Sequence, residues 1–314
     1  METVVIVANQ VLIMFLLIAL GAVLSKTKLL SERGAKDISS ILLYIVTPAL
    51  MLTSYQRDYD PLQAERLLWC VGLAILSHLV AIGLGALIFR KNEKYYPNDR
   101  DRIARFGAVY SNCGFFSYPL LIAVFGPEGI FYGVGFTAIF TLFSWSHGVY
   151  VLTGKFDRRQ LRKLLLNPAI LGVLAAMLLY FTGLRLPAQV NTVLEYLGNL
   201  NTPLAMIVLG TWVAGADWKR ALRDWTLFLT AGVRLLLVPL VMTGILLLLP
   251  VDDTVRVAAL LPAAAPAACN TAMLSALFGK DHFYASQLVA VSTILSIATM
   301  PFIVWLIQTL SGVQ

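Results

Sequence analysis

A polar run interrupts an apolar stretch of this chain, and its residue types could bind a small anion. The run ends at a proline, which has no amide hydrogen, and contains a glycine, which is a poor helix former, so a helix should break here. The amides at the start of the second half-helix would then attract negative charge. The candidate binding residues are Asn112, Cys113, Gly114, Ser117 and Tyr118, followed by Pro119.

A similar run lies in the ninth apolar stretch, where Pro262 and Pro266 stand four residues apart and disfavour a continuous helix. Asn270 and Thr271 follow at once and are the candidate binding residues of this run. We expect the two interrupted helices to cross near the middle of a membrane, with Asn112 and Asn270 facing a shared cavity. The alternative is that each run only kinks and packs its helix. The prolines expected to shape the crossing are Pro119, Pro262 and Pro266.

Three further ionisable residues fall deep inside apolar stretches. Arg234 lies about 15 Å into its stretch at 1.5 Å per residue, where a charge is costly unless it is paired or faces water. It is either a counter-charge for an anionic substrate or a structural group bonded to carbonyls freed by a helix break. His78 and His147 could titrate near neutral pH and are candidates for coupling, although a histidine in an apolar helix is more often only hydrogen-bonded.

The remaining sequence gives no sign of enzyme chemistry, so no catalytic residue is predicted. Cys70, Cys113 and Cys269 form no CxxC pair, and no nucleophile, phosphate-loop or metalloprotease motif is present. We therefore expect no metal and no cofactor. The net charge of +7 is spread over loops between apolar stretches, so it indicates membrane topology and not a nucleic-acid partner.

The composition predicts an all-α integral membrane protein. Hydrophobic residues make up 59% of the 314 residues and charged residues only 13%, against roughly 25% charged in soluble domains. Stretches of about 20 apolar residues match the thickness of a bilayer. The predicted spans are 4–24, 35–55, 65–89, 103–125, 129–152, 168–182, 193–214, 224–249, 254–278 and 283–311.

The second five spans echo the first five, which predicts an internal repeat. Thr47-Pro48 returns as Thr202-Pro203, and His78 has its counterpart in Arg234. Chance similarity competes with this interpretation because apolar segments draw on few residue types. Paired interrupted segments in matching halves are typical of secondary transporters. The predicted organisation is a first repeat at 1–153, a short basic cytoplasmic linker at 154–167 and a second repeat at 168–314.

Alternate loops carry the basic residues, which predicts how the chain sits in a membrane. The loops that follow spans 1, 3, 5 and 7 are rich in Lys and Arg, and the intervening loops are poor in them. Positive loops stay in the cytoplasm, so both termini are expected outside the cell or in the periplasm. The expected location is the cell inner membrane, as a multi-pass protein.

These features resemble the auxin efflux carrier family, which includes plant PIN-type carriers and bacterial permeases for small organic acids. The likeness covers essentially the whole chain. The matching residues are Thr47-Pro48, Asn112-Cys113-Gly114-Phe115, Tyr118-Pro119-Leu120, Phe125-Gly126, Pro262, Pro266, Asn270, Phe278-Gly279-Lys280-Asp281, Ser292-Thr293-Ile294-Leu295-Ser296 and Pro301.

The resemblance implies two inverted five-helix repeats whose fourth and ninth helices cross at prolines, with an anion bound beside Asn112, Cys113 and Gly114. It also implies a scaffold of helices 1, 2, 6 and 7 that forms a homodimer, and a transport domain that moves like an elevator. The long cytoplasmic loop of many plant members is reduced here to about 14 residues, so phosphoregulation is not transferred.

The predicted function is secondary active transport of a small organic anion, such as a malate- or malonate-like mono- or dicarboxylate. Its partners would be that anion and the lipid bilayer. One alternative is a sodium-coupled symporter of the bile-acid type, which also has crossed broken helices. Another is a membrane sensor or receptor built on a transporter-like body. The sequence predicts neither the direction of transport nor the coupling ion.

Overall fold

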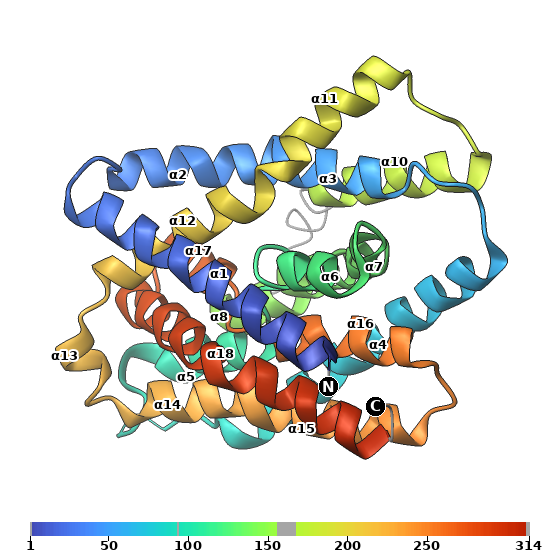
Figure 1. The fold of residues 1–314 in the computed structure, drawn as a ribbon. Coiled ribbons are helices and arrows are strands. Elements are labelled where there is room, and N and C mark those ends of the chain that lie inside the picture. Colours follow the sequence, from blue (N-terminus) through green and yellow to red (C-terminus); the bar gives the residue numbers. More distant parts are fainter. Residues whose placement is uncertain (1, 93, 156–167, 312–314) are drawn as a thin grey trace.

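The computed structural model describes residues 2–92, 94–155 and 168–311, and most of the expected linker, 156–167, lies outside the described residues (Figure 1). Every described element is helical. The first half contains α1 (Glu2–Lys26), α2 (Glu32–Ile41), η1 (Leu42–Val46), α3 (Thr47–Ser54), α4 (Pro61–Ile88), η2 (Pro97–Asp99), α5 (Arg100–Val109), α6 (Ser117–Phe125), α7 (Glu128–Phe143), η3 (Ser144–Gly148) and α8 (Val149–Thr153). The second half contains α10 (Pro168–Thr182), α11 (Ala188–Asn199), α12 (Asn201–Gly215), α13 (Trp218–Ala221), α14 (Trp225–Gly232), η4 (Val233–Leu237), α15 (Val238–Leu248), α16 (Asp253–Ala264), α17 (Asn270–Leu277) and α18 (His282–Ser311).

Seven continuous helical stretches in the described part of the chain are long and apolar enough to cross a membrane. They correspond to the predicted spans 1, 2, 3, 5, 7, 8 and 10. The other three predicted spans are shorter for separate reasons: the fourth is split into α5 and α6, the ninth into α16 and α17, and α10 has only 15 residues. The seven stretches are Thr3–Lys26, Glu32–Ser54, Pro61–Ile88, Glu128–Thr153, Ala188–Gly215, Trp225–Leu248 and His282–Ser311.

Prolines explain two of the three π-helical turns in the described ranges. Pro48 and Pro239 lack the amide hydrogen that would bond the carbonyl four residues earlier in an α-helix. In the turn before each proline, the amide of the preceding residue instead bonds the carbonyl five residues back, which makes a π-helical turn. The amide of Thr47 donates to the carbonyl of Leu42, and the amide of Val238 donates to that of Val233. The second of these turns, η4, contains Arg234 and presents its side chain to the interior.

The helices pack into two groups. One contains α1, α2–α3, α10 and α11–α12, and the other contains α4 to α8 together with α14 to α18; α1, α3, α10 and α12 contact α6, α7 and α18 across the boundary (Figure 1). Within the first group α1 and α12 lie very close. A Cβ at Gly210 would stand 2.1 Å from the carbonyl oxygen of Ile18, so only glycine allows this approach.

Ion pairs fix the outer ends of the two interrupted segments. At the start of α5, Arg100 bonds Asp281 at 2.7 Å and reaches Asp224 at 3.4 Å. At the start of α16, Asp252 bonds Arg66 of α4 at 2.6 Å. Each interrupted segment is therefore held at its outer end by a neighbouring helix, and its inner end meets the other segment in the interior.

Candidate functional site

The two interrupted segments meet through their backbones. Between α5 and α6 the chain passes the bridge at Ser111 and then turns over residues 113–116, and between α16 and α17 it is non-helical over residues 265–269. Ser111 pairs with Ala267 in an antiparallel bridge. The amide of Asn112 donates to the carbonyl of Pro266 at 2.7 Å, and the amide of Ala268 donates to the carbonyl of Tyr110 at 2.9 Å. Both predicted interruptions are present, and these hydrogen bonds join them directly.

The prolines lie where a break needs them. Pro119 is the third residue of α6, where an amide has no helical partner, so the first turn accommodates it and the half-helix does not bend there. Pro262 lies in the last turn of α16, and its carbonyl accepts the amide of Ala265 at 3.4 Å. Pro266 stands in the extended segment itself and offers its carbonyl to the other segment. The three prolines thus lie in the first turn of α6, in the last turn of α16 and just beyond α16.

Arg234 bonds the carbonyls at the inner ends of α5 and α16. Its guanidinium donates to the carbonyl of Ala108 at 3.2 Å, to that of Val109 at 2.9 Å and to that of Ala263. The residue is 2% exposed. Carbonyls in the last turn of a helix have no helical partner and carry partial negative charge. These are the bonds expected of a structural arginine that bonds carbonyls freed by a helix break. The positive charge of the guanidinium also lies at the crossing.

The polar groups at the start of α6 and α17 are mostly buried. The side-chain amide of Asn112 donates to the Sγ of Cys269 at 3.7 Å, which links the two segments through side chains as well. The hydroxyls of Ser117 and Thr271 are fully buried and have no hydrogen-bond partner among the residues that the structure describes. Asn270 is partly exposed, and no described hydrogen bond joins it to Asn112. The hydroxyls of Ser117 and Thr271 are thus buried polar groups without a partner in the described part of the chain, and they lie in the first turns of α6 and α17.

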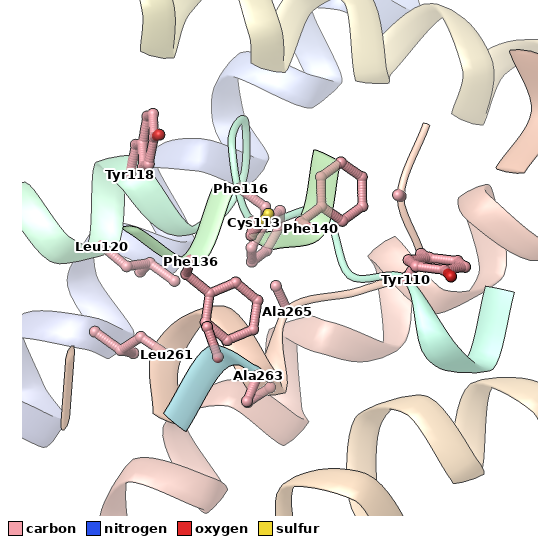
Figure 2. Close-up of a cluster of buried hydrophobic side chains, with 14 of the residues drawn as sticks. Tyr110, Cys113, Phe116, Tyr118, Leu120, Phe136, Phe140, Leu261, Ala263 and Ala265 are labelled. Atoms are coloured by element: carbon pink, nitrogen blue, oxygen red, sulfur yellow. The ribbon is translucent and has the colours of Figure 1, made fainter. Parts of the chain in front are cut away.

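A second small network lies on the α7 side of the first interruption. Tyr118 donates its hydroxyl to Thr137 at 2.9 Å, and the hydroxyl of Thr137 lies 3.8 Å from the Sγ of Cys113. Figure 2 shows Cys113 and Tyr118 within a cluster of apolar side chains. Gly114, beside them, is only partly buried. Sequence reasoning missed Thr137, because a single threonine in an apolar span gives no signal of its own.

The two intramembrane histidines both contact the ring of Tyr110. His147, in the π-helical turn η3, has its Nδ1 2.9 Å from the Tyr110 hydroxyl, which also bonds the carbonyl of Phe143 at 2.8 Å. The Nδ1 of His78 lies 2.7 Å from the carbonyl of Ala74 in its own helix, and its ring stacks on Phe143 with centroids 5.4 Å apart. Since the backbone of Tyr110 pairs with Ala268, both rings contact a residue of the crossing.

The second interruption also depends on a hydroxyl of α18. Its Ala267 amide donates to the Oγ of Ser292 at 3.2 Å, and Ser292 is fully buried. Ser292 belongs to the motif on which the family resemblance was based, but the residues alone did not indicate this bond. Only the fold identifies the Ala267 amide as the donor to this hydroxyl.

Comparison with known proteins assigns a class to this arrangement. A family model described as a membrane transport protein matches residues 6–162 and 151–304, so the chain is a transporter and not an enzyme. With its apolar helices, it is a multi-pass membrane protein. The chain belongs to this membrane transport family, the auxin efflux carrier family that its sequence resembles.

Three relatives illustrate the range of similarity. An uncharacterized transporter of Methanothermobacter thermautotrophicus is 27% identical over 93% of this chain and 96% of its own length. An uncharacterized transporter of Methanocaldococcus jannaschii is 25% identical over 64% and 67%. A candidate malonate transporter of Rhizobium meliloti is 22% identical over 87% of both chains.

Proposed function

We propose that this chain is a secondary active carrier of small organic anions, such as mono- or dicarboxylates, and that it binds them where α5–α6 crosses α16–α17. The observation that carries the proposal is the meeting of four helix ends at one buried place. Two are carboxyl ends and two are amino ends, so the charge balance there decides the sign of the ligand.

The charge balance favours an anion. Each helix end carries about half an elementary charge, so the carboxyl ends of α5 and α16 together contribute about −1. Arg234 bonds these ends and supplies +1. The amino ends of α6 and α17 are then left with about +1 between them. Because this part of the protein is buried, that charge is weakly screened and attracts a carboxylate.

Hydrogen-bond donors lie beside the same amino ends. The amides of Asn112 and Asn270 and the unpartnered hydroxyls of Ser117 and Thr271 could complete the shell of a carboxylate. Cys113, Gly114 and Tyr118 would form the wall on the α7 side. The Rhizobium relative is named as a candidate malonate transporter, and malonate is a small dicarboxylate.

The transport movement we propose is an elevator between the two packing groups. The ten spans would form two inverted repeats of five, with α5–α6 and α16–α17 as the fourth and ninth. The group with α1, α2–α3, α10 and α11–α12 corresponds to the expected scaffold and would pair with a second copy in a homodimer. The other group would carry the anion across the inner membrane, with both termini outside.

Uptake by the purified protein tests this function. Labelled malonate is presented to proteoliposomes, and protein-free liposomes are the control. Saturable uptake that malate or lactate inhibits, and that choline leaves unchanged, is the expected result. If folded protein takes up none of a panel of mono- and dicarboxylates, the organic-anion function is wrong.

A further inference from the structure

The carbonyls at the crossing are potential cation ligands. Broken helices in transporters expose backbone carbonyls that can coordinate a coupling ion, and oxygen atoms are the ligands that hard cations prefer. In this chain the carbonyls of Ala108 and Val109 end α5, and that of Ala263 lies one residue before the end of α16. A sodium ion that joined the two half-helices would need these oxygens or their neighbours.

A side chain of the protein already bonds all three. Arg234 lies in η4, and its guanidinium donates to the carbonyls of Ala108, Val109 and Ala263. The arginine is 2% exposed, so it cannot leave the crossing without breaking the packing around it. Its bonds connect α5 to α16 as a metal ion between them would, and its charge is permanent because the guanidinium stays protonated.

We propose that Arg234 is a tethered cation that takes the place of a coupling metal ion at the crossing. It holds the two half-helices together and keeps the amino ends of α6 and α17 available for the substrate. It acts on the substrate through the backbone and is a positioning residue. This inference rests on the proposed anion transport. It adds the prediction that transport needs no sodium.

The first test is the ion dependence of the wild-type protein. Initial rates of labelled malonate uptake are measured in sodium, potassium and choline buffers, with pH and voltage held constant. The three rates should agree within about twofold, because the cation at the crossing is a side chain of the protein and does not come from the buffer. A strict sodium requirement would overturn the tethered cation while leaving anion transport in place. Absence of any uptake would instead contradict the proposed function.

The second test replaces the guanidinium. Arg234→Ala should lower uptake more than about tenfold, because breaking a buried charged contact is costly, and guanidinium ions at non-denaturing concentration should restore part of it. Arg234→Lys, which keeps the charge and has three donors for three carbonyls, should retain more activity than Arg234→Gln. Arg256→Gln is the matched control, because Arg256 also bonds a backbone carbonyl but lies at the outer end of α16.

The outcomes separate a tethered cation from a merely structural arginine. Rescue of Arg234→Ala by guanidinium or by sodium, together with activity in Arg234→Lys, supports the proposal. Wild-type uptake by Arg234→Gln overturns it. Folded Arg234→Ala and Arg234→Lys that are both inactive, with no rescue, also overturn it. If the neutral variants do not fold, Arg234→Lys and the wild-type ion dependence still decide.

Discussion

The two interruptions at the crossing share a backbone pattern and differ in their side chains. The first, residues 110–116, is two residues longer than the second, residues 265–269. The first contains tyrosine, serine, asparagine and cysteine, and the second is mostly alanine. Alanine lets another backbone approach closely, and the polar residues supply groups that could bind a ligand. The two interruptions can therefore serve different roles. The first supplies polar side chains, and the second supplies a backbone that another segment can approach closely.

The largest effect expected from this division is at the two asparagines. Asn112→Ala should lower malonate uptake more than about tenfold, since losing a hydrogen bond to a charged group costs about 1.5–3 kcal/mol. Asn270→Ala should lower it about threefold, because Asn270 is partly exposed and water can replace part of the bond. The measurement is the initial rate in proteoliposomes at equal amounts of folded protein. Equal losses in both variants would contradict the division between the halves.

The second interruption should depend more on its neighbour α18 than on its own side chains. Ser292→Ala removes the acceptor of the Ala267 amide and leaves a buried N–H unpaired, at a cost of about 1–3 kcal/mol. We expect a lower thermal unfolding temperature for the detergent-solubilised protein. Ser286→Ala is the control, because Ser286 is partly exposed on the same helix and its hydroxyl donates to the carbonyl of His282 within that helix. If both variants melt alike, the Ser292 bond does not stabilise the crossing.

The sequence predicted the places of the breaks better than the bonds that hold them. Proline and glycine act on the local backbone, so the interruptions at residues 110–116 and 265–269 followed from their positions. The partners of Arg234 did not, because backbone carbonyls have no sequence signature and the bond to Ala108 spans 126 residues. Thr137 and Ser292 were hidden for a similar reason: their roles depend on which segment the fold brings beside them.

Tyr110 has no equivalent in the alanine-rich interruption, so its side chain gives a finer test. Tyr110→Phe removes the bonds to His147 and to the Phe143 carbonyl but keeps the backbone pairing with Ala268. The expected loss of stability is about 1 kcal/mol, measured as a shift of the unfolding temperature. Because the backbone pairing remains, uptake should fall less than in Asn112→Ala. A loss as large as that of Asn112→Ala would give the Tyr110 hydroxyl a direct part in transport.

The outer ends of the interrupted segments give the smallest expected effect, and it depends on pH. At the start of α5, the hydrogen bond from Lys280 lowers the pKa of Asp99. Burial raises the pKa of Asp281, but the amide of Tyr284 and the guanidinium of Arg100 outweigh burial and hold that pKa below its ordinary value. Both carboxylates are therefore charged in the folded protein at neutral pH.

The sign of the pH effect follows from these lowered values. A carboxylate with a lowered pKa stabilises the folded state fully above its ordinary pKa of about 3.9, and this contribution is lost as pH falls through the folded value. The unfolding temperature should thus be flat from neutral pH to about 5 and then fall. Asp281→Asn should have a lower unfolding temperature at neutral pH and a shallower acid decline, because the mutant lacks the titrating group. An unchanged acid decline in Asp281→Asn would mean that this ion pair does not fix the outer end of α5, and the first interruption would then depend on its inner bonds alone.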